Sequence, residues 1–377
     1  MIDVVFFGGY DPDYPRNAVL RRGLELNGVR VSECRVQPGR RFWRRYPALV
    51  RLWLGLQKTP PSPLRFLFVP EFAQKDVPLA RLLARLAARR VVFDPLASRY
   101  ETKILDWRRK PEGSPSALWN RAIDRRAFRY SDILIADTEA HKKYYCREFG
   151  VEPRRVAVIP VGFDDRIFSK ELGSIPAAVP DAKAPFIVLF FGSFLPLHGV
   201  DGVVEAARLV SEADTSVRFH FIGSGQTLDL VRSLTEKYRL GNIGFEGWLS
   251  QLELAERVAR TADVCLGVFG RTEKADRVVP HKVFQSMALG KPVITARTPA
   301  AGELFMDRRD ILFCRKEEPR DLAEAILELK RDLALRARIA RNGRELVWRK
   351  YQPAALGAVL KETLLKAAEF AGRAHVG

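Results

Sequence analysis

The chain has 377 residues, of which 47% are hydrophobic and 29% charged, a composition typical of a folded, water-soluble protein with about two domains. Its formal net charge is +18, which leaves nucleic acid, an anionic membrane and a phosphorylated substrate as possible partners. No segment has the pattern of a transmembrane helix or a signal peptide, and the four cysteines lack CxxC spacing. These features exclude a disulfide framework and a zinc site and favour a cytoplasmic protein with reduced thiols.

The first half of the chain alternates apolar strands with helices. The strand DVVFFGG is followed by a loop and by a helix from Ala18 to about Asn27, which Gly28 ends. The later strands are FLFVP, VVFD, ILIADT and VAVIPVG, with an Arg-rich helix from Pro78 to Arg89 after the first of them. This order predicts a parallel sheet that is covered by helices on both faces.

The basic charge is concentrated in this half, where residues 1–168 hold 32 Lys and Arg against 19 Asp and Glu. Between Arg35 and Lys58 there are seven basic residues and no acidic one. A helix there places Phe42, Tyr46, Leu49, Trp53 and Leu56 on one stripe. This pattern predicts an amphipathic helix at an anionic membrane, with the surface residues Arg41, Trp43, Arg44, Arg45 and Trp53. The alternative is a helix that packs on the first domain while its arginines reach solvent.

The second half repeats the alternation after a Pro- and Ala-rich seam from Ser169 to Pro185. Its strands are FIVLFFG, VRFHFIG, IGFEG, CLGVFG and PVITA, and its helices are expected at 200–209, 227–238, 252–262 and 282–289. A last helical pattern covers about 353–371. We therefore predict an N-terminal Rossmann-like domain over 1–168, a second one over 185–352 and a C-terminal helical segment over 353–377.

The segment from Arg271 to Glu303 carries the clearest functional pattern. A strand ends in CLGVFG, and the loop after it brings Lys274 and Arg277 to the start of a helix that holds Lys282. Ligands of parallel sheets bind beyond the strand ends, and a helix N-terminus surrounded by cations favours a diphosphate. The alternative interpretation is a solvated basic loop beside an ordinary crossover.

The same segment contains a recognisable motif, Ala288-Leu289-Gly290-Lys291-Pro292-Val293 followed by Glu303. It resembles the donor-nucleotide region of the retaining glycosyltransferases of family 4, which have the GT-B fold. In that family two Glu residues precede the motif, and Arg277 and Gln285 stand at their positions here. A Gln can still accept a hydrogen bond from a ribose hydroxyl, whereas Arg277 cannot replace a carboxylate but can bind a phosphate or a sugar acid.

This resemblance implies an α/β protein of the GT-B class, with two Rossmann-like domains facing across a deep interdomain cleft and a C-terminal helix that crosses back to the first domain. The family usually holds the donor diphosphate with an Arg and a Lys, at positions that Ser193 and His198 occupy here. The donor-binding residues that it implies are Gly192, Ser193, His198, Gly199, Gly223, Gly225, Gly247, Trp248, Phe269, Lys274, Gln285, Ala301 and Glu303. A plain strand-to-helix turn is the alternative for the Gly192 loop, where glycine amides at a helix N-terminus suit phosphate.

On the acceptor side, the family's usual His is absent from the segment that begins at Asp94. Polar residues at the strand ends are implied to line the acceptor site, namely Gly8, Gly9, Tyr10, Asp11, Ser98, Tyr100 and Thr102. Helix capping is the alternative role for Ser98 and Thr102. Thr138 is expected to cap the next helix, with His141 on the protein surface.

The resemblance implies a hexosyltransferase that moves a sugar, with retention, from a UDP- or GDP-linked donor to a glycan or a polyprenyl- or other lipid-linked acceptor. Arg277, Lys282 and Asp94 are the implied catalytic residues, and no metal or other cofactor is expected because cations neutralise the diphosphate. Synthesis of envelope or extracellular polysaccharide or glycolipid at the inner face of the plasma membrane follows from the basic helix. The alternatives are a non-catalytic nucleotide-sugar-binding protein of the same fold and a nucleic-acid binder, although the sequence lacks a nucleic-acid-binding motif.

Overall fold

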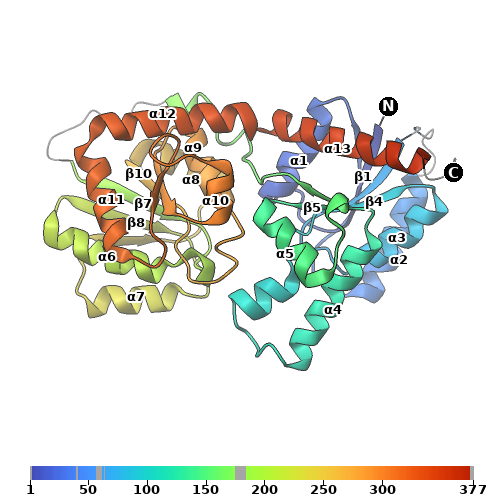
Figure 1. The fold of residues 1–377 in the computed structure, drawn as a ribbon, viewed down its shortest axis with the longest axis horizontal. Coiled ribbons are helices and arrows are strands. Elements are labelled where there is room, and N and C mark those ends of the chain that lie inside the picture. The colour runs from blue at the N-terminus through green and yellow to red at the C-terminus, as the bar shows by residue number, and fades with distance from the viewer. Residues whose placement is uncertain (1, 40, 57–61, 63, 175–183, 374–377) are drawn as a thin grey trace. The chain divides into compact units, whose positions relative to one another are not determined.

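A computed structural model describes residues 2–39, 41–56, 62, 64–174 and 184–373. The chain divides into two compact units, one made of Met1–Val161 with Pro353–Gly377 and the other of Gly162–Gln352. Figure 1 labels the elements of each. The predicted seam falls near the start of the second unit, and its residues 175–183 lie outside the described residues.

The first unit contains a six-stranded sheet in the order β2-β1-β3-β4-β5-β6, and all of its neighbouring strands are parallel. Its strands are β1 (Ile2–Gly9), β2 (Arg30–Val36), β3 (Leu64–Val69), β4 (Arg90–Phe93), β5 (Ile133–Ala136) and β6 (Val156–Val158). Strand β1 is buried along almost its whole length. A strand that is apolar on both faces requires cover on both faces, and the crossover helices provide it.

The helices of this unit are α1 (Pro15–Leu26), α2 (Phe42–Leu56), α3 (Val77–Leu86), α4 (Pro115–Tyr130), α5 (Glu139–Phe149) and the C-terminal α13 (Pro353–Arg373). A short π-helix, η1 (Glu101–Asp106), and a 3-10 turn, η2 (Pro153–Arg155), complete it. One hydrophobic core joins the sheet to buried side chains of α2, α3, α4 and α5. These helices therefore cover the same face of the sheet.

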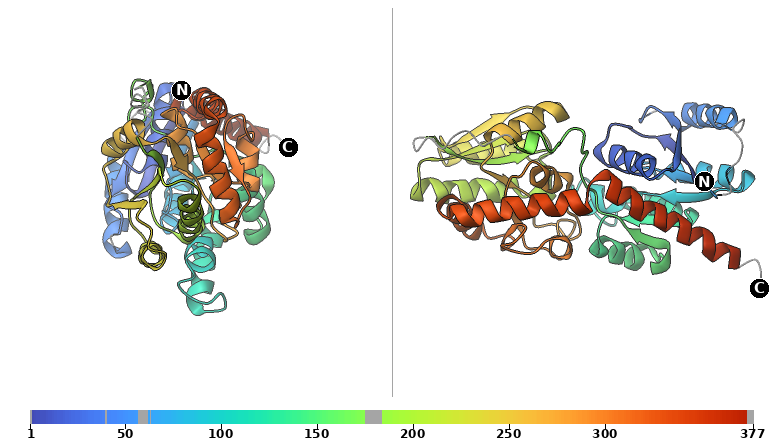
Figure 2. Two further views of the ribbon diagram at one scale, coloured as in Figure 1. Left: turned by 90° about the vertical axis from the view of Figure 1, so that its left-hand side faces the viewer. Right: turned by 90° about the horizontal axis from the view of Figure 1, so that it is seen from above.

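Helix α13 packs directly on α1, and the right-hand view of Figure 2 shows it running along this unit. The contact is made by two glycines, because a Cβ atom at Gly23 would lie 2.4 Å from the carbonyl oxygen of Pro353 and 2.9 Å from Cα of Gly357. The side chain of Asn27 donates to the carbonyl of Ala354 at 2.9 Å. Small residues let the two helix backbones approach, so the end of the chain is part of the first unit.

The second unit has a six-stranded parallel sheet in the order β12-β11-β10-β7-β8-β9. Its strands are β7 (Phe186–Phe191), β8 (Val217–Ile222), β9 (Ile243–Glu246), β10 (Val264–Leu266), β11 (Val293–Ala296) and β12 (Leu312–Cys314). The order of the strands reverses between β7 and β10. In an open parallel sheet such a reversal opens a crevice at the carboxyl ends of the two strands, where ligands bind.

The helices of the second unit are α6 (Val200–Ala213), α7 (Leu228–Lys237), α8 (Gln251–Thr261), α9 (His281–Ala288), α10 (Pro299–Leu304), α11 (Pro319–Arg331) and α12 (Leu333–Lys350). The 3-10 turns are η3 (Leu172–Ser174) and η4 (Pro196–His198). The expected end of α9 is confirmed, because Gly290 adopts a left-handed φ of 69° just beyond it. A helix C-terminus commonly ends at a glycine in this conformation.

All four cysteines are free thiols, and three of them, Cys34, Cys265 and Cys314, are buried. None of the helices in the described ranges is long and apolar enough to cross a membrane.

Candidate functional site

The carboxyl ends of β7 and β8 form two interlocked glycine turns. Gly192 and Gly223 have φ values of 118° and 126°, which favour glycine. A Cβ atom at Gly223 would lie only 2.2 Å from the carbonyl oxygen of Gly192. Two backbone hydrogen bonds tie the turns together, from Phe194 to Ser224 and from Thr227 to Phe194, each 2.9 Å long. The predicted residues Gly192, Gly223 and Gly225 therefore lie in two turns that contact each other.

The loop after β10 joins this structure from the other side of the strand-order reversal. The amide of Phe269 donates to the carbonyl of His198 at 3.1 Å, and that of Gly270 donates to Leu197 at 3.0 Å. Gly199 has a φ of 63°, and a Cβ atom there would lie 2.5 Å from the carbonyl carbon of Phe269. The strand ends of β7, β8 and β10 thus meet in one place within the second unit.

Lys282 lies at the centre of this arrangement. It is 5% exposed, and its Nζ is 3.8 Å from the centre of the Phe190 ring. A Cβ atom at Gly192 would be 3.5 Å from the same Nζ. This amine has no hydrogen-bond partner among the described residues. Burial therefore lowers the pKa of Lys282 well below its usual value, although the face of an aromatic ring favours the charged form.

His198 adds a second titratable group to the same turn. Its Nδ1 donates to the carbonyl oxygen of Ser193, because a carbonyl oxygen can only accept, so the neutral ring offers Nε2 as an acceptor. Burial lowers the pKa of His198 well below 6.5, and the nearby positive charges of Lys282 and Lys274 lower it further. Burial thus shifts the pKa values of Lys282 and His198 in the same direction, and a bound anion would oppose both shifts.

The other predicted donor residues lie around this centre at different depths. Lys274 and Arg277 are each 8% exposed, and the guanidinium of Arg277 forms an ion pair with Glu273. Gln285 is 5% exposed on α9, three residues after Lys282 and therefore on the same side of the helix. Their proximity to a donor stays a prediction.

Four further predicted donor residues differ in their exposure. Trp248 follows β9 and is 62% exposed, and Gly247 before it is exposed as well. Ala301 is buried near the N-terminus of α10, where its amide bonds to Thr298, while Glu303 on the same helix is exposed. The indole of Trp248 is exposed, and its contact with a base stays a prediction.

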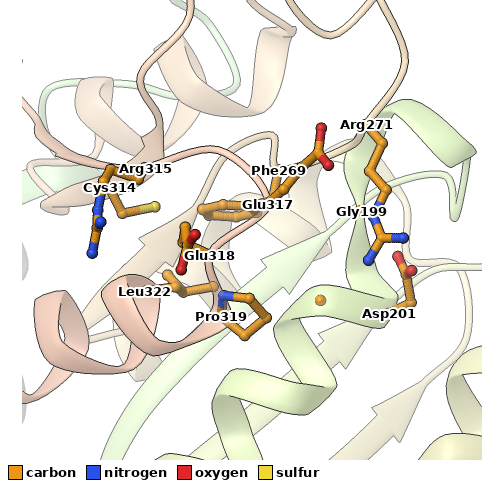
Figure 3. A pocket seen from close by; sticks show the side chains of 11 residues that line it. Gly199, Asp201, Phe269, Arg271, Cys314, Arg315, Glu317, Glu318, Pro319 and Leu322 are labelled. Carbon is orange, nitrogen blue, oxygen red and sulfur yellow. The ribbon is translucent and has the colours of Figure 1, made fainter.

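A small cavity lies beside the contact of Gly199 with Phe269 (Figure 3). Its volume of about 30 Å³ suits one or two water molecules. Figure 3 shows Arg271 and Asp201 on one side of it and Arg315 on the other. The cavity is too small to hold a nucleotide. The arrangement around Lys282 is therefore the better candidate for the donor site.

Two residues of this site were not predicted from the sequence. Phe190 supplies the ring beneath Lys282, and its position inside a buried strand resembles any other core residue. Thr227 has a buried Oγ1 for which the described part of the chain supplies no hydrogen-bond partner, and its amide donates to the carbonyl of Phe194. A threonine before a helix commonly serves as a cap, so its sequence context gave no separate signal.

In the first unit, the predicted acceptor residues surround a buried polar network. Asp94 is 1% exposed, and its Oδ2 accepts from Nε of Arg16 at 2.7 Å. Arg16 also donates to the carbonyls of Ile159 and Pro160. Burial, followed by the charge of Asp94, raises the pKa of the neighbouring Glu71 to about 9. The pair of Asp94 with Arg16 gives Asp94 a structural role, and its predicted catalytic role stays untested.

The remaining acceptor-side residues have mixed environments. Gly8 and Gly9 end β1, Tyr10 is 2% exposed, and Asp11 is exposed. Ser98 is buried and caps the helical segment that begins at Arg99 and continues into η1, because its Oγ accepts from the amide of Glu101 at 2.8 Å. The backbone amide of Tyr100 donates to Asp124 at 2.8 Å, and Tyr100 and Thr102 are half-buried. The capping alternative therefore describes Ser98.

The expectation for His141 was wrong, whereas the predicted cap at Thr138 is confirmed. His141 is fully buried, with Nδ1 2.6 Å from Asp137 and Nε2 3.0 Å from Glu101. Burial alone would lower its pKa, but the two carboxylates outweigh burial and raise the pKa to about 9. The Glu101 partner is 40 residues away in the sequence, so local pattern gave no sign of this pairing.

The prediction that the apolar stripe of α2 faces a membrane is wrong, and the alternative of a helix that packs on the first domain is confirmed. Leu49 and Trp53, on the apolar stripe, are buried in the core of the first unit, and Arg45 bonds to Asp76 at 2.8 Å. Arg45 and Trp53 consequently do not face a membrane, because the sheet needs the stripe of α2 as cover. Of the five predicted surface residues, Arg41, Trp43 and Arg44 are exposed.

The two parallel sheets, together with a strand-order reversal beside glycine turns and a buried lysine, define a nucleotide-binding α/β protein. Comparison with known proteins identifies the family. The family described as glycosyl transferases group 1 matches residues 174–346, and the glycosyl transferase 4-like domain matches residues 2–162. The chain therefore belongs to the group 1 glycosyltransferases.

Curated relatives match part of the chain. An uncharacterized glycosyltransferase of Methanocaldococcus jannaschii is 32% identical over 157 residues, which are 42% of each protein. A D-inositol 3-phosphate glycosyltransferase of Thermomonospora curvata is 27% identical over 239 residues, 58% of this chain and 54% of that protein. The chain spans about half the length of the curated relatives that it matches.

Solved structures confirm the predicted GT-B fold class. HepE of Anabaena, in complex with UDP-glucose, has a TM-score of 0.70 and 16% identity, covering 97% of this chain and 100% of HepE. Sucrose-phosphate synthase of Thermosynechococcus elongatus has a TM-score of 0.68 and 15% identity, covering 99% of this chain and 100% of the synthase. At these identities the likeness concerns the fold alone.

Proposed function

We propose that this protein transfers a sugar from a UDP- or GDP-linked donor to a glycan or lipid-linked acceptor, and that the second unit binds the donor diphosphate beside Lys282. The observation that carries this proposal is the buried amine of Lys282, which has no hydrogen-bond partner among the described residues and lies next to the Gly192 turn. An unpartnered buried polar group is costly. A ligand that supplies negative charge there removes this cost.

The surroundings of Lys282 favour a diphosphate over other anions. The glycine turns at Gly192 and Gly223 leave space for a ligand to approach the backbone closely. Lys274 lies close enough to affect the pKa of His198 and adds positive charge. HepE, which has a similar fold, was solved in complex with UDP-glucose, and this likeness supports a nucleotide-sugar donor for the present chain.

In the proposed reaction the acceptor hydroxyl attacks the anomeric carbon on the face that the diphosphate leaves, so that configuration is retained. The bond from the anomeric carbon to the diphosphate oxygen breaks, and the leaving diphosphate takes up the proton of the acceptor hydroxyl. The leaving diphosphate gains negative charge in the transition state, and Lys282, Lys274 and Arg277 neutralise it. To neutralise the diphosphate, Arg277 either breaks its ion pair with Glu273 or contacts the diphosphate while the ion pair stays formed. These cations supply the charge that a metal ion would otherwise provide, so the proposed transfer requires no metal.

The proposed acceptor and the proposed location are based on features of the first unit. Its basic charge and the exposed residues Arg41, Trp43 and Arg44 of the α2 region support peripheral contact with the anionic inner face of the plasma membrane. A lipid-linked acceptor is available at that surface. We therefore propose a role in envelope or extracellular polysaccharide or glycolipid synthesis.

A second candidate function is nucleotide-sugar binding without catalysis. The observation that favours it is the ion pair of Arg277 with Glu273, which places a cation where related glycosyltransferases carry a carboxylate. The same fold and diphosphate site would then bind a donor without cleaving it.

Assays with a panel of UDP- and GDP-sugars separate the two functions. Calorimetry measures binding of each donor, and release of UDP or GDP measures transfer or hydrolysis. Binding with turnover supports the transferase, and binding without turnover under any donor and acceptor supports the non-catalytic protein. If no nucleotide or nucleotide sugar binds, both proposals are wrong.

A further inference from the structure

The outer surface formed by α2, α3 and α4 is almost free of exposed carboxylates. Residues 35–130 contain 22 Lys and Arg and seven Asp and Glu. Six of these seven acids are at most 4% exposed, namely Glu71, Asp76, Asp94, Glu101, Asp106 and Asp124. The exception is Glu112, which is exposed in the connection before α4.

The buried acids have partners inside the unit, which explains why they are absent from the surface. Asp76 accepts from the amide of Gly9 at 2.9 Å and pairs with Arg45. Asp124 of α4 accepts from the amides of Arg99 and Tyr100 at 3.0 and 2.8 Å. Within residues 35–130 these acids therefore do not offset the exposed basic side chains, although Arg81 of α3 pairs with Asp132 at 2.7 Å just after α4.

Large apolar side chains are exposed on the same three helices. On α2, Trp43 is 52% exposed and Leu54 is 63% exposed. On α3, Leu82 and Leu86 are 56% and 78% exposed, and their spacing of four residues places them on one stripe. Arg85, between them in sequence, is exposed as well.

Helix α4 continues the pattern. Leu118 and Trp119 are 60% and 65% exposed near its N-terminus, and Arg125, Arg126 and Arg129 are exposed further along. Each of the three helices thus carries exposed apolar side chains together with exposed arginine.

The three helices form one layer on the sheet. Their inner sides share one hydrophobic core, and Figure 1 shows them on the side of the sheet away from α13. Tyr46 of α2 donates to the carbonyl of Lys75, just before α3, and the charge of Arg126 on α4 acts on the same tyrosine. Carboxylates reappear beyond α4, where Glu148 of α5 pairs with Arg121 at 2.7 Å. The basic and apolar surface therefore ends at α5.

We propose that the outer surface of α2, α3 and α4 docks on an anionic lipid bilayer. Arginines attract anionic headgroups, and exposed Trp and Leu side chains enter the interface between headgroups and acyl chains. The exposed Trp43 and Trp119 could also stack on bases, but the exposed leucines Leu54, Leu82, Leu86 and Leu118 have no aromatic face and favour a lipid interface. This inference rests on the proposed function in one respect, the lipid-linked acceptor that the membrane would provide. It extends the proposed membrane contact from α2 to α3 and α4.

The test is flotation of the full-length protein with vesicles of phosphatidylcholine alone or mixed with phosphatidylglycerol. We expect wild type to float only with the anionic vesicles and to be released at high salt. The double variant L82E/L86E should lower the bound fraction about tenfold, through lost apolar insertion and added negative charge. The matched control is L230E/L252E, which changes two leucines of the second unit that are 51% and 57% exposed and should float like wild type.

Several outcomes would overturn the proposal. They are wild type that stays in solution with anionic vesicles, L82E/L86E that floats like wild type, or a control that is lost equally. DNA retention that L82E/L86E leaves unchanged, without flotation, would assign the charge to nucleic acid instead. If L82E/L86E does not fold by its thermal melt, L118S/W119S on α4 replaces it with the same expectation.

Binding of UDP or GDP, measured by calorimetry without vesicles, keeps the two proposals apart. Flotation without nucleotide binding would leave the docking surface intact and refute the donor site. Nucleotide binding without flotation would refute the docking surface alone.

Discussion

Replacing Lys282 by Met should change stability and ligand binding in opposite directions. Met has nearly the same length as Lys but no amine, so Lys282→Met removes a buried polar group that has no hydrogen-bond partner in the described structure. Such a group costs about 1–3 kcal/mol. The free protein should therefore become more stable, and its Tm should rise by about 2–4 °C for each kcal/mol gained.

The same substitution should weaken nucleotide binding. A charge-assisted hydrogen bond contributes about 1.5–3 kcal/mol, so the Kd for UDP or GDP should rise roughly 10- to 150-fold. Calorimetry and thermal melts measure the two effects. Lys291→Met is the matched control, because Lys291 is also buried in this unit with a pKa that burial lowers, yet no donor contact is assigned to it.

The pH dependence of stability provides a further check on Lys282. Its pKa is lowered in the folded protein, so the unfolded chain binds more protons below about pH 10.4, its usual pKa. Wild-type stability should therefore rise with pH from the lowered pKa toward that value, and Lys282→Met should lose this contribution. A lower Tm for Lys282→Met together with an unchanged Kd would refute the reasoning.

Three other predictions concern separate parts of the molecule. Gly23→Ala should destabilise the first unit by about 1–3 kcal/mol, because its Cβ atom would meet the backbone of α13; Gly55→Ala, with open space around it, is the control, and equal denaturation midpoints would contradict the packing. The folded pKa of His141 is raised from 6.5 to about 9, so its stabilisation is complete below pH 6.5 and is lost as pH rises through 9. His141→Gln should flatten that decline in urea unfolding, and an unchanged slope would argue against the ion pairs. Trp248→Ala should raise the Kd for UDP or GDP about tenfold if its indole stacks on the base and leave the Tm nearly unchanged, since the side chain is 62% exposed; an unaltered Kd would exclude the contact.

Much of the fold could be predicted because its signals are local. Apolar runs such as FIVLFF and glycines after strands mark β7 and the turn at Gly192, and the structure contains both. The prediction omitted β2, β12 and the helices α4, α10, α11 and α12. Strand β2 is an edge strand with charged residues at Arg30, Glu33 and Arg35, so its apolar pattern is weaker than that of β1.

Parts of the site depend on contacts between distant residues, which no local pattern reveals. The motif around Lys282 located the cations, but the ring of Phe190 beneath the amine comes from another strand. In the same way, the sequence predicted His141 as a surface residue, whereas in the structure it is buried and paired with Glu101 and Asp137. The amphipathic pattern of α2 suits a membrane surface and a protein core equally well. Trp53 is buried because α2 packs on the sheet of the first unit.

The central claim is that the second unit holds a diphosphate between Lys282 and the Gly192 turn. The most direct measurement is a crystal structure of the protein with UDP or GDP bound. We predict that a phosphate oxygen lies within about 3 Å of Lys282 Nζ and that backbone amides of the Gly192 turn face the diphosphate. A nucleotide bound elsewhere, with Lys282 Nζ still against the Phe190 ring and without a phosphate contact, would contradict the account.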